Sequence, residues 1–157
     1  MIVILHNIRS VFNVASIFRT ADGVGVEKIY LTGITPGPLD KFGKMRGDFT
    51  KVSLGSEKSI EWEQVSSTVK LLKRLKNEGC EIWAVEQHAK SVPYHSVGLL
   101  RSGGSKTCLV MGSEVNGLPQ SVLSIADKIL EIPMKGSKES LNVAIAFGIV
   151  VYHLKYC

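Results

Sequence analysis

The sequence predicts an α/β protein with a parallel sheet flanked by helices. Short apolar runs, typical of strands buried on both faces, alternate along the chain with segments whose apolar residues recur at helical spacing. Strands that alternate with helices form parallel sheets, because consecutive parallel strands need a long crossover connection. A length of 157 residues with 45% apolar content suits one hydrophobic core. We therefore expect residues 1–157 to form a single domain.

The first elements are a strand, a helix and a second strand. Residues 2–5 are uniformly apolar and predict a buried strand. Apolar residues then recur at helical spacing over residues 14–21 until Gly23 interrupts the pattern, which predicts a helix. Arg19 falls off the apolar face of this helix, so we expect it to point toward the strand ends or solvent. Residues 27–31 predict the second strand.

A long loop is expected over residues 32–50, which are rich in glycine and proline and show no apolar period. Loops of this length inside a compact domain are usually functional or disordered. Its basic residues suit contacts with phosphate groups, although an ordinary solvated loop explains them equally well. The charged residues of this segment are Lys41, Lys44, Arg46 and Lys51, set against Asp40 and Asp48.

The rest of the chain continues the alternation and ends in a strongly apolar helix. Residues 52–55 predict a short strand, and we interpret Trp62 as a packing anchor on the polar stretch that follows. Further strands are expected over residues 81–85, 107–111 and 129–132, a turn over residues 101–106, and helices over residues 65–75, 119–125 and 140–156. Because the last helix is apolar nearly all round, we expect it to be buried in its own domain or at a subunit interface.

Two glycine-bearing turns, over residues 112–118 and 132–143, follow two of the predicted strands. In a parallel sheet such turns meet at the carboxyl ends of the strands, where backbone N–H groups face a crevice suited to ligands. A few placed polar groups in a mostly apolar pocket are typical of a binding site. Two ordinary turns, with Ser140 as a helix N-cap, explain the pattern about equally well. The candidate polar groups are Glu114, Asn116, Lys135, Ser140 and Asn142.

Charge and cysteine usage narrow the class of protein. Lys and Arg number 19 against 14 Asp and Glu, and a net charge of +5 favours an anionic partner, nucleic acid before membrane, although solubility alone also explains such a charge. Cys80, Cys108 and Cys157 are widely spaced, so we expect neither a disulfide framework nor a metal site. The apolar runs are too short to cross a bilayer, and the first residues lack the pattern of a signal peptide. We therefore expect a soluble, cytoplasmic protein.

Three runs, NVASIFRTA, LVMGSEVNGL and EIPMKGSKESLNVAIA, stand in this order and together span nearly the whole chain. They resemble the three motifs of the SpoU/TrmH-type ribose methyltransferases, which belong to the SPOUT superfamily. The order of all three makes the resemblance more specific than any one motif. Ala15 stands where the first motif usually has a glycine, and it adds a methyl group near the expected site.

The resemblance implies a particular fold and cofactor. Proteins of this superfamily carry a C-terminal trefoil knot, an exception to the rule that protein chains are not knotted. They bind S-adenosylmethionine in that knot, largely through backbone groups. The lack of a G-x-G-x-x-G run agrees with a cofactor site that is not of the Rossmann type. The residues implied to contact the cofactor are Gly112, Ile132, Met134 and Leu141, with Glu86 as a neighbour.

The resemblance also implies five catalytic residues, Asn13, Arg19, Glu114, Ser140 and Asn142. Methyl transfer to a ribose 2′-hydroxyl needs the reacting atoms in line and the developing charge stabilised. An arginine side chain keeps its proton, so we assign Arg19 to the phosphate and the developing oxyanion rather than to a base. Glu114 and Asn142 are placed to orient Arg19 and the ribose, Ser140 to hydrogen-bond nearby, and Asn13 to hold the first-motif turn.

The predicted function is therefore S-adenosylmethionine-dependent methylation of a ribose 2′-hydroxyl in RNA. The catalytic domain or its homodimer would have to recognise the RNA itself, which favours tRNA over rRNA. In the family, the first motif of one subunit lies near the cofactor of the other. A non-catalytic RNA-binding module would share the positive charge without needing Arg19, Glu114 and Asn142 together. A phosphate-binding α/β enzyme would explain the glycine turns but not the Ser140-Leu141-Asn142 run.

Overall fold

The computed structural model describes residues 1–98 and 106–157. Within these residues, seven parallel strands form one sheet in the order β3-β2-β1-β6-β4-β7-β5. The predicted parallel α/β architecture is confirmed. The strands are β1 (Ile2–His6), β2 (Lys28–Thr32), β3 (Glu61–Val65), β4 (Glu81–Val85), β5 (Val92–Pro93), β6 (Thr107–Met111) and β7 (Lys128–Glu131).

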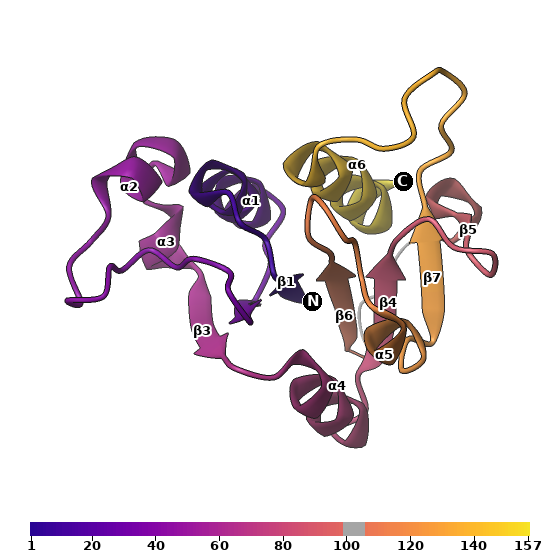
Figure 1. Ribbon diagram of the computed structural model, residues 1–157, viewed down its shortest axis with the longest axis horizontal. Helices are drawn as coiled ribbons and strands as arrows, with labels where there is room; N and C mark the ends of the chain where they lie inside the picture. The colour runs from indigo at the N-terminus through magenta and orange to yellow at the C-terminus, as the bar shows by residue number, and fades with distance from the viewer. Residues whose placement is uncertain (99–105) are drawn as a thin grey trace.

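Helices cover both faces of the sheet (Figure 1). On one face α1 and α6 lie side by side with α2 and α3 beyond α1, and on the other face lie α4 and α5. Helices therefore bury both faces of the sheet. The helices are α1 (Val11–Gly23), α2 (Gly47–Ser53), α3 (Ser56–Ser59), α4 (Thr68–Asn77), α5 (Gln120–Leu123) and α6 (Val143–Tyr156), with a 3₁₀ turn at Tyr94–Ser96.

The central strands are apolar throughout because each of their faces packs against helices. In β1, Val3 and Leu5 face the core under α1 and α6, whereas Ile2 and Ile4 face the core over α4. Successive side chains of a strand point to opposite faces, so an uninterrupted apolar run fills both cores. This arrangement explains why the strands over residues 2–5 and 107–111 were predictable from apolar runs.

The strands end together at one edge of the sheet. Leu5 of β1 is paired in register with Met111 of β6, and Met111 with Val85 of β4. Since all these strands are parallel, the segments that follow them leave from the same edge. The turns after β1, β4, β6 and β7 therefore converge, as expected for a ligand site in an open parallel sheet.

The segment between β2 and α4 differs from the prediction. Residues 47–53 form α2 rather than part of a loop followed by a strand, because Phe49 is buried against Phe18 of α1, with ring centroids 5.2 Å apart in an edge-to-face contact. Strand β3 was missed because it lies at the edge of the sheet, where its glutamates face solvent and pair with Lys28. Its presence delays the start of α4 to Thr68.

The last helix is buried along one face and exposed along the other. Asn142 rather than Ser140 is its N-cap, because the Asn142 Oδ1 atom accepts a hydrogen bond of 2.9 Å from the Ala144 N–H group. The core of its own chain covers only one face of this helix. Its buried residues are Val143, Phe147, Val150, Val151 and Leu154, and its exposed ones include Ile145, Tyr152 and Tyr156.

Two further expectations concern a predicted turn and membrane-spanning segments. The turn predicted over residues 101–106 lies, apart from residue 106, outside the described part of the chain. Among the described residues, no helix has the length and apolar character needed to cross a bilayer.

Replacing Phe49 by alanine should destabilise the protein by about 3–5 kcal/mol, because it leaves a cavity where two aromatic rings meet. Phe42 provides a matched control, since it is exposed in the same segment; Phe42→Ala should change the free energy of unfolding by less than about 0.5 kcal/mol. Urea denaturation at equal protein concentrations measures both. Similar losses for the two variants would show that α2 is not anchored through Phe49.

Candidate active site

A cavity of about 660 Å³ opens at the carboxyl ends of β4, β6 and β7. Its walls come from the turn after β6, the segment after β7 and the first turn of α6, with the turn after β4 closing one side. This volume is in the range of small-molecule sites. The lining residues are Val85, Glu86, Gln87, Met111, Gly112, Ser113, Glu114, Val115, Asn116, Gly117, Glu131, Ile132, Met134, Ser140, Leu141, Asn142, Val143 and Ala146.

Glu114, Asn13 and Asn142 form a hydrogen-bonded network beside this cavity. The Asn13 Nδ2 atom donates to the Glu114 Oε1 atom at 2.9 Å. The Asn142 Nδ2 atom donates to the Asn13 Oδ1 atom at 3.1 Å, and Asn142 also caps α6. The network therefore joins the first turn of α1, the turn after β6 and the start of α6.

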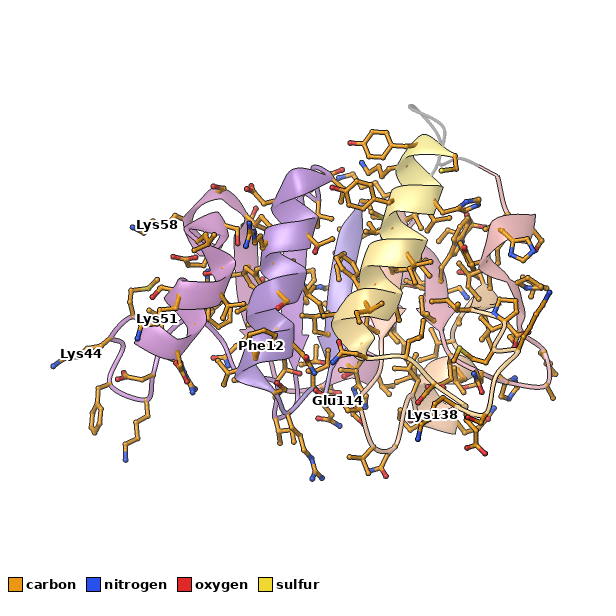
Figure 2. All side chains as sticks on the ribbon, turned by 90° about the horizontal axis from the view of Figure 1, so that it is seen from above. Phe12, Lys44, Lys51, Lys58, Glu114 and Lys138 are labelled. Carbon is orange, nitrogen blue, oxygen red and sulfur yellow. The ribbon has the colours of Figure 1, made fainter. Side chains whose placement is uncertain are left out.

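The Glu114 carboxylate also receives backbone hydrogen bonds from the residues before α1. The Arg9 N–H group donates to Oε2 at 3.1 Å, and the Ser10 N–H group to Oε1 at 3.4 Å. Partial burial by itself raises the pKa of Glu114, but the hydrogen bonds from Asn13 and from these backbone N–H groups outweigh it, so the pKa is lowered. A carboxylate at a helix N-terminus is further favoured by the helix dipole. Figure 2 shows Glu114 at the end of the molecule where α1 and α6 begin.

The turn after β6 is held in shape by two glycines and Glu86. Gly117 has a φ of +60°, and a Cβ atom there would lie 2.2 Å from the Glu86 Oε2 atom. A Cβ atom at Gly112 would lie 2.7 Å from the Gly117 carbonyl carbon. The Glu86 carboxylate accepts hydrogen bonds from the Leu118 N–H group at 2.6 Å and the Gln87 N–H group at 3.0 Å. Glu86 therefore braces the turn as well as lining the cavity.

The structure brings most of the predicted site residues together. Glu86, Gly112, Ile132, Met134 and Leu141, which were predicted to contact a cofactor, all line the cavity. Glu114, Ser140 and Asn142 line it too, and Asn13 lies directly behind it through its bonds to Glu114 and Asn142.

Arg19 lies away from the other predicted catalytic residues of the same chain. It is exposed on α1, six residues after Asn13, which corresponds to about 9 Å farther along the helix axis. Arg19 is not among the residues that line the cavity. Lys135, a candidate polar group, is exposed on the segment after β7 and is not among the residues that line the cavity.

Sequence reasoning missed the backbone and side-chain groups that tie the loops together. The Arg9 and Ser10 N–H groups at Glu114 carry no sequence signal, because any residue supplies a backbone donor. Gln87 lines the cavity, and its Nε2 atom donates to the Glu139 carbonyl oxygen, which fixes the segment after β7. Its position directly after the strand over residues 81–85 was the available signal.

Comparison with known proteins places this arrangement in a family. The sequence model of the SpoU rRNA Methylase family matches residues 1–152. The chain belongs to this family. Its first motif contains Ala15 in place of the usual glycine; this residue lies in α1 rather than in a turn, and its methyl group is fully buried in the core.

The relatives of this chain include enzymes named for methylation of tRNA and of rRNA. The chain is 34% identical to tRNA (guanosine(18)-2′-O)-methyltransferase of Aquifex aeolicus, over 97% of this chain and 67% of the relative. It is 27% identical to 23S rRNA (guanosine-2′-O-)-methyltransferase RlmB of Vibrio vulnificus, over 97% of this chain and 57% of the relative.

A solved structure of a relative has the same fold. The AdoMet-bound rRNA methyltransferase from Sinorhizobium meliloti superposes with a TM-score of 0.85 at 29% identity, over 98% of this chain and 54% of that one. The chain thus spans between about half and two thirds of the length of these relatives.

Replacing Glu114 by glutamine should destabilise the protein near neutral pH, because its NH2 group takes the place of one carboxylate oxygen. That group would face either the Arg9 N–H donor or the donors of Asn13 and Ser10. The pKa of Glu114 in the folded protein lies below its ordinary value of 4.5. Its stabilising contribution is therefore complete above that value and is lost as the pH falls through the lowered pKa. The stability difference between parent and variant should be constant from about pH 6 to pH 8 and shrink below about pH 4.

Chemical denaturation at each pH measures this difference. Glu139→Gln is the control, because Glu139 contacts Gln87 through its carbonyl oxygen rather than its carboxylate. A difference for Glu114→Gln that stayed the same at acid pH would contradict the proposed role of the charged carboxylate.

Proposed function

We propose that this chain transfers a methyl group from S-adenosylmethionine to a ribose 2′-hydroxyl of RNA. The observation that carries the proposal is the network of Glu114, Asn13 and Asn142 beside the cavity, built from the three motifs of a SpoU-family chain. Relatives named for 2′-O-methylation of tRNA and rRNA support the same reaction. A purely RNA-binding role would leave this network and cavity unexplained.

The cavity suits S-adenosylmethionine, whose sulfonium makes its methyl group electrophilic when the cofactor is bound. The turn after β6 offers backbone groups close to the cavity, because Gly112 and Gly117 leave out side chains where the chain packs tightly. Apolar walls from Ile132, Met134 and Leu141 suit the uncharged parts of such a ligand. We assign cofactor contacts to Gly112, Ile132, Met134 and Leu141, with Glu86 acting through the turn that it braces.

The catalytic groups position the ribose and stabilise charge. Asn142 keeps its Oδ1 atom on the α6 backbone and its Nδ2 atom on Asn13, so its side chain is held rigidly at the cavity wall. Ser140 lies on the same wall and offers a hydroxyl to the ribose. Preorganised groups of this kind lower the barrier because they need no reorganisation as charge develops. The positive group that faces the developing oxyanion is Arg19.

Because Arg19 does not line the cavity of its own chain, we propose that a second copy supplies it. In a symmetric dimer, Arg19 of one protomer would approach the cavity of its partner. Exposed apolar residues support such a contact: Ile145, Tyr152 and Tyr156 follow one another at helical spacing on α6, and Phe12 is exposed on the neighbouring α1. Val151, in contrast, is fully buried in the core of its own chain.

The substrate that we favour is tRNA, with rRNA as the second candidate. The identity of 34% to a tRNA-modifying relative exceeds the 27% to an rRNA-modifying one. Mass spectrometric mapping of ribose methylation, in tRNA and rRNA from cells with and without the gene, tests both assignments. Loss of one methylated nucleotide in tRNA is the expected result, and unchanged methylation of both RNAs contradicts the proposal.

We further propose that residues 1–157 act as one catalytic domain with a trefoil knot at its C-terminal end. The segment after β7 meets the turn after β4 at Glu139 and the first turn of α1 at Asn142, which suits a threaded path. Stretching a single molecule from its two ends provides the test. A knot would tighten and leave the chain shorter than its full contour length, whereas complete extension would contradict the knot.

Replacing Arg19 by lysine or alanine should lower the rate of methyl transfer about 10²–10³-fold, as for loss of one charge-stabilising group. Binding of S-adenosylmethionine should change far less, because Arg19 is assigned to the phosphate and the developing oxyanion rather than to the cofactor. Single-turnover kinetics with saturating RNA measures the rate of methyl transfer independently of the affinity for RNA. A separate titration with S-adenosylmethionine measures cofactor binding. A variant within a few-fold of the parent rate would show that Arg19 does not act in the transition state.

Placing a charge on the exposed face of α6 should dissociate the dimer and abolish activity without unfolding the chain. Ile145 is the site of choice because 56% of it is exposed, so Ile145→Glu buries no charge in the monomer. Gln120→Glu on α5, on the opposite face of the sheet, is the control with the same change in charge. Sedimentation at micromolar concentration, with activity on the same samples, gives the result. An active, monomeric Ile145→Glu variant would contradict the shared site.

A further inference from the structure

The segment between β2 and β3 forms a basic lobe that is not part of the cavity. It comprises a tight turn over residues 39–45 and the helices α2 and α3, up to residue 59. Figure 2 shows Lys44, Lys51 and Lys58 along one flank of the molecule, on the far side of α1 from α6. We propose that this basic lobe binds a single-stranded segment of the substrate RNA, with Phe42 stacking on an unpaired base. The inference rests on the proposed function in that RNA is the substrate.

The turn presents Phe42 to solvent in a fixed conformation. Phe42 is 75% exposed, more than any other large apolar side chain of the described residues. The Asp40 Oδ1 atom accepts hydrogen bonds from the Phe42 N–H group at 2.8 Å and the Lys44 N–H group at 2.9 Å. Gly43 completes the turn with a φ of +76°. Because these hydrogen bonds already hold the backbone of the turn, little backbone entropy is lost when the ring binds.

The surroundings of Phe42 are positively charged. The Lys41 Nζ atom lies 5.0 Å from the centre of the Phe42 ring. Of the acidic residues in the lobe, Asp40 bonds to the turn, Asp48 pairs with Arg46 at 3.0 Å, and Glu57 is buried against Ser53. Within the described part of the chain, no carboxylate pairs with the remaining lysines of the lobe. These lysines are Lys41, Lys44, Lys51 and Lys58.

An exposed aromatic ring among lysines fits single-stranded RNA better than a duplex or a protein. Every base has a face that stacks on an aromatic ring, but only when the base is unpaired. Lysines contact the phosphates on either side of it. An open hollow of about 700 Å³ lies at the foot of the turn and is lined in part by Leu39, Lys41, Met45 and Arg46, which leaves room for neighbouring nucleotides.

The position of the basic lobe agrees with this use. Helix α2 packs on α1 through the contact of Phe49 with Phe18, and Arg19 is the next residue along α1. RNA held on the lobe would therefore lie next to the helix that carries the proposed catalytic arginine. The lobe lies across α1 from α6 and its exposed apolar residues, so the proposed dimer leaves it accessible.

Fluorescence anisotropy with a short, unstructured, labelled oligoribonucleotide tests the stacking contact. Phe42→Ala should weaken binding about 5- to 150-fold, the range expected for loss of one base–aromatic stack. Phe42→Leu should be weakened similarly, since it keeps apolar contact but not the flat ring, and Phe42→Trp should retain the parental affinity. The same oligoribonucleotide paired with its complement should bind Phe42→Ala and the parent equally. Equal affinity of Phe42→Ala and parent for the single strand would overturn the proposal.

The salt dependence of the same binding tests the lysines. Lys44→Gln should reduce the slope of log affinity against log salt by about 0.7, the value for one phosphate contact on a single strand. Lys73→Gln on α4 is the matched control on the other face of the sheet and should leave the slope unchanged. Phe42→Ala should lower affinity without changing the slope. Equal slopes for Lys44→Gln and Lys73→Gln would show that the lobe does not contact phosphate.

Cofactor binding and methylation measured on the same proteins separate this proposal from the proposed function. If the parent methylates RNA and Phe42→Ala has the same KM for RNA, the basic lobe is not the RNA surface while the enzyme activity stands. If the parent binds single-stranded RNA through Phe42 but neither binds S-adenosylmethionine nor methylates, the activity is wrong while the lobe is supported. A parent that fails to bind single-stranded RNA overturns the lobe.

Discussion

The site depends on the carboxylate of Glu114 at the beginning of α1. Backbone N–H groups before a helix have no intrahelical acceptor, and Glu114 supplies one to Arg9 and Ser10 from a turn more than a hundred residues away in sequence. Its other partner, Asn13, passes the connection on to Asn142 and so to α6. Since each partner is already bonded, moving one of these segments would leave polar groups of the others unsatisfied.

A second set of contacts fixes the opposite wall of the cavity. The turn after β6 approaches β4 so closely that Gly117 leaves no room for a side chain beside Glu86. Glu86 in turn bonds to the backbone on both sides, at Gln87 and Leu118. The cavity therefore lies between two braced carboxylates, one at the helix side and one at the strand side. A wall built this way is preorganised, which is the property that electrostatic catalysis requires.

The strands that could be predicted from the sequence are those whose residues are uniformly apolar. Strands such as β1 and β6 are apolar on both faces and stand out as runs, whereas the edge strand β3 is half polar and was missed. Helix α2 was missed because its anchor, Phe49, is a single apolar residue in a glycine-rich stretch. The meeting of Asn13, Glu114 and Asn142 came from the resemblance of three motifs, because residue spacing carries no information about contacts across 101 and 129 residues. The separation of Arg19 from them required the structure.

Helix α1 fixes the positions of the cavity, Arg19 and the basic lobe relative to one another. Helix α1 has 13 residues, about 20 Å in length, and each part of it has a different neighbour. Its first turn bonds to Glu114, its buried face holds α2 through Phe18, and its exposed face carries Arg19. A helix packed into the core on this scale moves as a rigid unit, so the distances between the cavity, the arginine and the basic lobe are fixed together. If a second protomer completes the cavity, the RNA bound on the lobe of one chain is presented with that chain's arginine to the cofactor site of the other. The dimer would then be required for aligning the substrate as well as for supplying a charge.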